Sequence, residues 1–253
     1  MNGLWRRLAV VGSAIVIAQT FFAPDALAAS PGGGGTSPLG GAGTAIPTSK
    51  CSTGGNSCFA GYAVAVPTGS HSASLTFVVS ALTCGKIERS VLPSLILENS
   101  TGSKDVVGGV EETCLSGKAT YTALVQAGST LTSITKRVRA RDKVTVIASV
   151  TSTNVAVKVK DVTAVWSKTV EEPRLVPAFA DFGMDWVFNR NTGVVFGVPK
   201  FGKATFSNSL AGGKAIAKLT HTKFNRTISG TRDITTGPIN SAGTGFVCTF
   251  VHA

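Results

Sequence analysis

From Phe59 onward, apolar and polar residues alternate along most of the chain. Side chains two residues apart lie on the same face of an extended strand, so this period predicts strands with one buried face. Gly, Ser, Asn and Pro separate the alternating runs, as they do between strands. We therefore predict β-strands at residues 61–67, 73–80, 91–99, 105–113, 119–126, 143–150, 154–160 and 163–170.

The same part of the chain lacks the helical i, i+3, i+4 spacing of apolar residues. Many strands without crossover helices indicate antiparallel sheets packed face to face. No period of about 20–50 residues indicates a repeat architecture. The predicted fold is an all-β, two-sheet antiparallel β-sandwich over residues 58–253, with no substantial helix after the N-terminal segment.

The N-terminus has the pattern of an export signal. Arg6 and Arg7 precede an apolar stretch, Leu8–Ala23, and Ala26-Leu27-Ala28 is a small-residue cleavage site. The alternative is a membrane anchor, but a span needs about 20 apolar residues. We predict a signal peptide at 1–28, a flexible Gly/Ser/Pro-rich leader at 29–57, and a secreted chain without a transmembrane anchor.

The formal net charge is +11, and removal of residues 1–28 leaves +10. A basic exported protein is attracted to anionic surfaces, which suggests an anionic cell-envelope polymer as a partner. Basic residues are not interleaved with aromatic ones, so no specific nucleic acid is expected. Residues 136–143 place Arg137, Arg139, Arg141 and Lys143 on one face if extended. We expect a solvated edge strand there, with a polyanion-binding stripe as the alternative.

Five cysteines stand at 51, 58, 84, 114 and 248. Export to an oxidising compartment favours disulfides. Cys84 ends one strand-like run and Cys114 ends another, and the two are predicted to pair. Cys51 and Cys58 flank a Gly-Gly turn that a second bond would close. Cys248 would then be left without a predicted partner. The cysteine and histidine spacing does not fit a metal site, and neither a metal nor a cofactor is expected.

Two stretches resemble a known signature. Met184–Asn191 reads MDWVFNRN, and Val198–Ser209 reads VPKFGKATFSNS. Together they are similar to the A-E-W-I-V-E and F-G-x-V-x-F motifs of the glutamic peptidases, or eqolisins, which are secreted proteases with a concanavalin A-like β-sandwich. Weaker matches follow in the same order, so the resemblance covers about residues 57–251; they are FAGY at 59–62, YTA at 121–123, RDKV at 141–144 and INSAGTGFVCTF at 239–250.

The resemblance implies a catalytic Glu that activates a water and a catalytic Gln that stabilises the oxyanion. Those family positions are occupied here by Asn189 and Val107. An asparagine amide does not accept a proton from water, and valine has no hydrogen-bond donor. Loss of one oxyanion donor alone costs about 10²–10³ in rate. We therefore expect no useful peptidase activity.

A shifted alignment offers a different pair. Gln126-Ala127-Gly128 matches the Q-A-G of the family literally, and Val170-Glu171-Glu172-Pro173 resembles its V-E-x-P. In that alignment Gln126 and Glu171 would be the catalytic residues. It leaves the order of the later motifs unexplained.

The expected role is thus binding of a peptide, a glycan or a cell-envelope polymer on the concave sheet of an eqolisin-like protein without activity. The candidate binding residues are Tyr121, Asp185 and Trp186. For Asp185 we expect a solvent-facing strand residue, with a polar remnant of the substrate groove as the alternative. The alternatives in function are an active acid glutamic endopeptidase with relocated residues and a structural exported protein.

Overall fold

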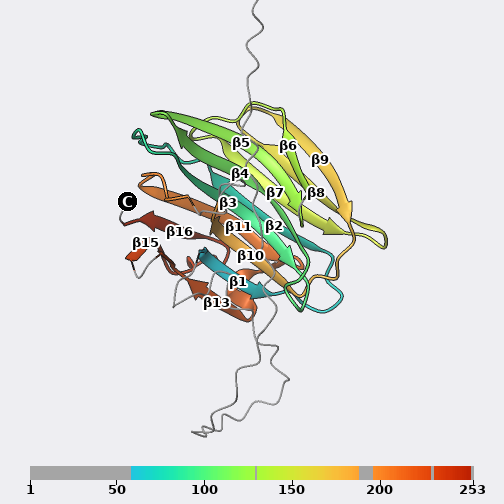
Figure 1. Ribbon diagram of the computed structural model, residues 1–253. Coiled ribbons are helices and arrows are strands. Elements are labelled where there is room, and N and C mark those ends of the chain that lie inside the picture. Colours follow the sequence, from blue (N-terminus) through green and yellow to red (C-terminus); the bar gives the residue numbers. More distant parts are fainter. Residues whose placement is uncertain (1–57, 129, 188–195, 229–230, 252–253) are drawn as a thin grey trace, which may run out of the picture.

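The computed structural model describes residues 58–128, 130–187, 196–228 and 231–251. These residues form two antiparallel β-sheets packed face to face, which confirms the predicted all-β sandwich (Figure 1). The helical structure in this part of the chain is one 3-10 turn, Ile216–Lys218. None of the described helical structure is long and apolar enough to cross a membrane.

The first sheet has seven strands. In spatial order they are β13 (His221–Phe224), β1 (Ala60–Ala65), β10 (Phe179–Asp185), β3 (Arg89–Glu98), β4 (Asp105–Leu115), β5 (Lys118–Ala127) and β6 (Thr130–Ile134). The central strands β3 and β4 are buried along nearly their whole length, so this sheet is covered on both faces over its middle.

The second sheet has nine strands. In spatial order they are β14 (Arg226–Ile228), β15 (Thr231–Thr236), β16 (Phe246–Phe250), β11 (Lys203–Ala211), β2 (Ser72–Val78), β7 (Lys143–Val150), β8 (Asn154–Asp161) and β9 (Trp166–Pro173), and the short β12 (Lys214–Ala215) pairs with β11. On β7 and β8, every second side chain is buried and the others are partly or fully exposed. The alternation in the sequence is therefore that of a sheet with one face in the core and one face exposed to solvent.

The main core lies between the two sheets. Phe77 of β2, Val146 of β7 and Phe182 of β10 are among its fully buried side chains. Gly108 on β4 lets the sheets approach closely, since a Cβ there would lie 2.7 Å from Val146 Cγ1 and 2.8 Å from Val157 Cγ1. A glycine in the middle of a strand is thus explained by sheet-to-sheet packing.

Strand β9 begins at Trp166, three residues later than predicted. Asp161 is the reason. Its Oδ1 accepts hydrogen bonds from the backbone N–H groups of Thr163 and Ala164, at 2.9 and 2.8 Å. This local bonding makes a turn of residues that the sequence pattern assigned to the strand.

The expected edge strand at 136–143 is wrong. Residues 136–142 lie in the loop that carries the chain from β6 in one sheet to β7 in the other, and Lys143 begins β7. Val138 is buried, and the backbone N–H of Arg139 donates to Asp142 Oδ2 at 2.7 Å. The buried valine and this bond hold the loop, while Arg137, Arg139 and Arg141 remain exposed.

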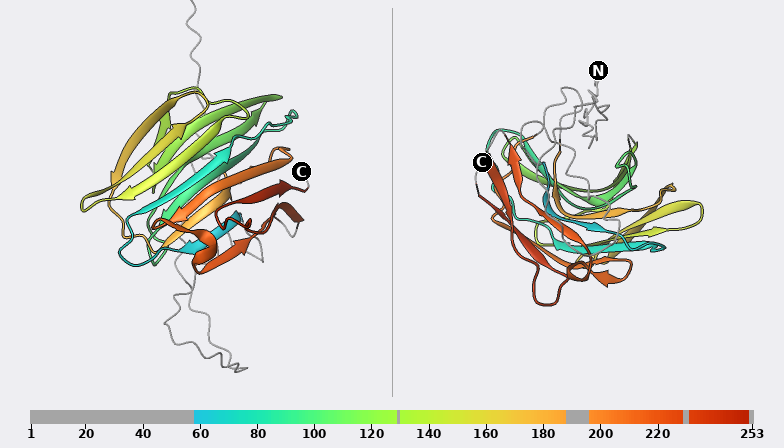
Figure 2. Two further views of the ribbon diagram at one scale, coloured as in Figure 1. Left: turned by 180° about the vertical axis from the view of Figure 1, so that it is seen from behind. Right: turned by 90° about the horizontal axis from the view of Figure 1, so that it is seen from below.

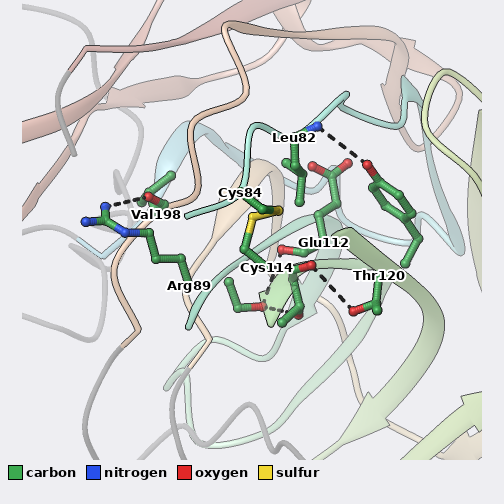
Figure 3. Close-up of a disulfide and its surroundings, with 10 residues drawn as sticks. Leu82, Cys84, Arg89, Glu112, Cys114, Thr120 and Val198 are labelled. Carbon is green, nitrogen blue, oxygen red and sulfur yellow. Dashed lines mark hydrogen bonds between the residues drawn. A yellow bond between two sulfur atoms is a disulfide. The ribbon is translucent and has the colours of Figure 1, made fainter. Parts of the chain in front are cut away.

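The predicted disulfide between Cys84 and Cys114 is confirmed, with 5.3 Å between the Cα atoms (Figure 3). It ties the segment after β2 to β4. Cys58 is also disulfide-bonded, and its predicted partner Cys51 lies outside the described residues, as do the predicted signal peptide and leader. Cys248 is free and buried.

Candidate functional site on the concave face

The seven-stranded sheet turns one face to the core and the other to the concave side of the sandwich (Figure 2). We call the latter the concave face. On β3 and β5 the even-numbered residues lie on it, and on β4 and β10 the odd-numbered ones, because their neighbours Leu95, Val125, Val106 and Phe182 belong to the core between the sheets.

Cross-strand pairing places Val107 in the middle of a row on this face. Asp181 of β10 pairs with Ile96 of β3, Ile96 pairs with Val107 of β4, Val107 pairs with Gln126 of β5, and Gln126 pairs with Leu131 of β6. The row therefore carries one carboxylate and one amide, with aliphatic side chains between them.

Val107 is fully buried in a second hydrophobic cluster, which we call the concave-face cluster. It consists of Leu92, Ile96, Val107, Leu124 and Val187, with Leu131 and Phe196 packed against it. The position at which the family resemblance requires a hydrogen-bond donor is thus packed among aliphatic side chains, with Gln126 paired to it on β5. Val107 itself offers nothing to a developing oxyanion, and the Gln126 amide donates to the Gly128 carbonyl.

The other family position, Asn189, lies outside the described residues. Strand β10 ends at Asp185, earlier than the resemblance suggests, and Trp186 and Val187 follow it. Within β10, the residue level with Val107 is Asp181, which is half-buried. Sequence reasoning missed Asp181, because the pairing register of β10 with β3 is what brings it into this row.

The shifted pair, Gln126 and Glu171, is not brought together. Gln126 is buried on the concave face, where its Nε2 donates to the Gly128 carbonyl at 2.7 Å. Glu171 is exposed on β9 and pairs with Ala156, on the outer face of the nine-stranded sheet. Since the two side chains lie on opposite sides of the sandwich, they do not share a water.

The candidate binding residues have three different surroundings. Tyr121 packs half-buried against the core between the sheets, and its hydroxyl accepts a bond from the Leu82 N–H at 3.5 Å (Figure 3). Burial raises the pKa of Tyr121. Trp186 is half-buried, and its backbone N–H donates to Asp185 Oδ1 at 2.8 Å. Tyr121 therefore faces the interior of the sandwich and not the concave face.

The expectation of a solvent-facing Asp185 is wrong, since this residue is 4% exposed. Its carboxylate interacts electrostatically with the guanidinium of Arg226, which is fully buried on β14. Burial lowers the pKa of the Arg226 guanidinium, and the negative charges of Asp233 and Asp185 oppose that effect. The carboxylate is buried because it compensates a buried cation from the opposite sheet.

Arg226 joins two parts of the site. Its Nη1 forms an ion pair with Asp233 Oδ2 at 2.7 Å, and its Nη2 donates to the carbonyl of Phe196 at 3.2 Å. The Phe196 N–H in turn donates to the carbonyl of Val187 at 2.8 Å. The buried guanidinium thus holds Phe196 where it packs against the concave-face cluster.

Further along the face, Glu111 belongs to a hydroxyl network. Its Oε1 accepts bonds from Ser90 Oγ at 3.1 Å and Thr113 Oγ1 at 3.0 Å. Burial raises the pKa of Glu111, and the two hydroxyl bonds oppose the rise. In the described part of the chain, no group of three or more His, Cys, Asp or Glu residues is arranged to hold a metal ion.

No protein-family model matches the chain, and no curated protein matches its sequence significantly. Solved structures do match its fold. Scytalido-glutamic peptidase with a peptide-based transition-state analogue superposes with a TM-score of 0.62 at 14% identity, over 76% of this chain and 98% of the peptidase. SCP-B, a member of the eqolisin family in complex with a tripeptide, gives 0.57 at 13% identity, with coverage of 76% and 98%.

Aspergilloglutamic peptidase from Aspergillus niger gives a TM-score of 0.53 at 17% identity, over 64% of this chain and 99% of that one. At these identities the likeness establishes the fold. The chain has the β-sandwich fold of these eqolisin-type structures, as its sequence motifs predict. Whether it has the chemistry of those proteins depends on its own side chains.

Proposed function

We propose that this chain is an exported, eqolisin-like β-sandwich protein that lacks peptidase activity and binds a peptide, a glycan or a cell-envelope polymer on its concave face. The observation that carries the proposal is the burial of Val107 in the concave-face cluster. Peptide hydrolysis needs a donor for the oxyanion close to a base that activates water, and a closed aliphatic cluster occupies that place.

The polar groups in the same row do not restore the chemistry. Asp181 and Gln126 are three strands apart, which is about 14 Å between Cα atoms at the usual strand spacing. An aspartate and a glutamine side chain do not span that distance to hold one water between them. The row therefore supports binding more than catalysis.

The accessible part of the face is a strip along β5 and β6. Thr120, Thr122 and Ser133 are exposed there, and Leu131 is half-buried beside them. Strand β6 is an edge strand of the seven-stranded sheet as described. Hydroxyl groups next to an edge strand suit an extended peptide or sugar chain, which adds hydrogen bonds along its length. The Cys84–Cys114 disulfide supports export to an oxidising compartment.

The first prediction tests activity. Purified protein should not cleave unfolded casein between about pH 2 and pH 7, because base and oxyanion donor are not held together. Glu171→Gln and Asp181→Asn, assayed beside the parent chain, identify the residue responsible should cleavage occur. Cleavage abolished by Asp181→Asn or Glu171→Gln would establish a relocated endopeptidase and overturn the proposal.

Binding is tested with insoluble cell-envelope polymers and immobilised peptides. Thr122→Arg places a long side chain on the strip, whereas Thr220→Arg adds the same charge at an exposed position before β13, at the other edge of the sheet. We expect retention to fall with Thr122→Arg alone. Absence of retention on every polymer and peptide would favour a structural exported protein instead.

A further inference from the structure

Charge is distributed unequally between the surface and the interior. Of the twenty lysines and arginines in the described part of the chain, eighteen are exposed. Of the twelve carboxylates in the same part, eight are buried, three are half-buried, and Glu171 alone is exposed. Burial also raises the pKa of several of these carboxyls, Glu112 and Glu172 among them. The surface is therefore far more cationic than the net charge of the chain indicates.

Part of this charge gathers on the outer face of the nine-stranded sheet. Lys143 on β7 and Lys158 and Lys160 on β8 alternate with the buried Val144, Val157 and Val159, so they point away from the core. Lys158 and Lys160 are about 6.6 Å apart along their strand. Lys143 lies diagonally across from Lys160, at about 7–8 Å. We call these three lysines and the hydroxyls beside them the basic face.

The hydroxyl groups lie in the same cross-strand rows as the lysines. Thr145, Lys160 and Ser167 form one row, and Lys158 pairs with Thr169 in the next. Thr76 continues the first row on β2 but is buried, and its Oγ1 lies 2.9 Å from Thr145 Oγ1. Lys158 and Lys160 thus have hydroxyl-bearing neighbours in their rows, whereas Lys143 pairs with Val78 of β2.

We propose that the basic face is a second binding surface, on the opposite side of the molecule from the concave face, and that it takes an anionic polysaccharide. Three lysines in fixed register attract a chain of carboxylates, and the hydroxyls between them bond to sugar hydroxyls and to the anionic groups. The proposal does not depend on the function assigned to the concave face.

Charge and shape favour this partner over two others. The outward side chains of β2, β7 and β8 include no aromatic ring. Binding of single-stranded nucleic acid relies on aromatic stacking of bases, and interfacial membrane binding relies on Trp, Phe or Leu inserted among the headgroups. The ammonium and hydroxyl groups of this face, with the single exposed carboxylate of Glu171 at its β9 edge, match an extended, hydrophilic polyanion better.

The test uses the purified full chain and polygalacturonate as the probe. Binding is measured by isothermal titration at about 50 mM and 300 mM salt, since exposed charge contacts are screened as salt rises. The triple variant Lys143→Gln, Lys158→Gln, Lys160→Gln removes the basic face. The matched control Lys86→Gln, Lys104→Gln, Lys118→Gln removes the same charge from exposed positions on loops and at a strand end. Circular dichroism checks that both remain folded.

We expect the basic-face triple to weaken binding about tenfold at low salt and the control triple to weaken it less than about threefold. Equal losses in the two triples would mean that net charge alone acts, and would overturn the proposal. Absence of binding to polygalacturonate would overturn it too. So would equal or tighter binding of DNA or of vesicles with anionic lipid through the same three lysines.

Discussion

Arg226 is the largest side chain that is fully buried in the described part of the chain. An arginine in such a place requires compensation, and Asp233, Asp185 and the carbonyl of Phe196 supply it. One residue of β14 thereby joins the end of β10, Phe196 and strand β15. Removal of the cation would leave Asp185 buried without its opposite charge.

We therefore predict that Arg226→Met destabilises the protein by about 3–5 kcal/mol, as expected when one partner of a buried ion pair is removed. Urea unfolding followed by tryptophan fluorescence measures the change. Arg232→Met is the matched control, because Arg232 is exposed on the adjacent strand and its loss should change stability by less than about 0.5 kcal/mol. Similar losses for both variants would show that the buried network is not responsible.

At the scale of elements, the contact between β1 and β10 is closer than ordinary side chains allow. Gly61 pairs with Gly183, and a Cβ on Gly183 would lie 2.1 Å from the carbonyl oxygen of Ala60. The two glycines lie directly opposite one another on the paired strands. This pair fixes β10, and with it Asp181 and Asp185, beside β1.

Gly183→Ala should consequently cost about 2–4 kcal/mol and loosen β10, because backbone must move to admit the methyl group. Gly85→Ala is the control, since a Cβ there meets nothing within 4 Å. Thermal unfolding compares the two, and hydrogen exchange of the β10 amides locates the effect. A Gly183→Ala protein with unchanged melting temperature and protected β10 amides would refute this account.

Considered as a whole, the molecule holds most of its described carboxyls away from water. Glu112 is the clearest case, since it lies fully buried between the sheets near the disulfide (Figure 3). Its Oε1 accepts a bond from the Ser80 N–H at 2.8 Å, and burial raises its pKa to about 7. Burial raises the pKa of Glu111, Asp161 and Glu172 in the same direction. The folded protein thus retains protons that the unfolded chain releases.

It follows that stability falls as the pH rises from about 4.5 to about 7, with about 2–4 kcal/mol of the loss due to Glu112. Glu112→Gln keeps the acceptor for Ser80 but has no proton to lose, so its urea midpoint should depend less on pH. Glu171→Gln, at an exposed carboxyl, should follow the parent chain. A parent protein that gains stability from pH 4.5 to pH 7 would contradict this assignment.

The sequence by itself determined the fold class and most strands. A sheet with one wet face requires period-two alternation, and β7 and β8 appear where that alternation predicts them. The likeness to eqolisin-type structures and the Cys84–Cys114 bond were also predicted from the chain alone. The strand pattern is local, and a linear sequence records it, whereas the disulfide joins the segment after β2 of one sheet to β4 of the other.

Tertiary structure alone decided which distant residues meet. The register of β10 with β3 placed Asp181 level with Val107, and a slip of one residue would have turned it to the other face. Asp185 was expected in solvent because nothing near it in sequence reveals Arg226, forty-one positions later and in the other sheet. The tertiary structure likewise keeps Gln126 and Glu171 apart, because it places them on opposite faces of the sandwich. Pairing register and cross-sheet contacts are set by how the whole core packs, so no local pattern encodes them.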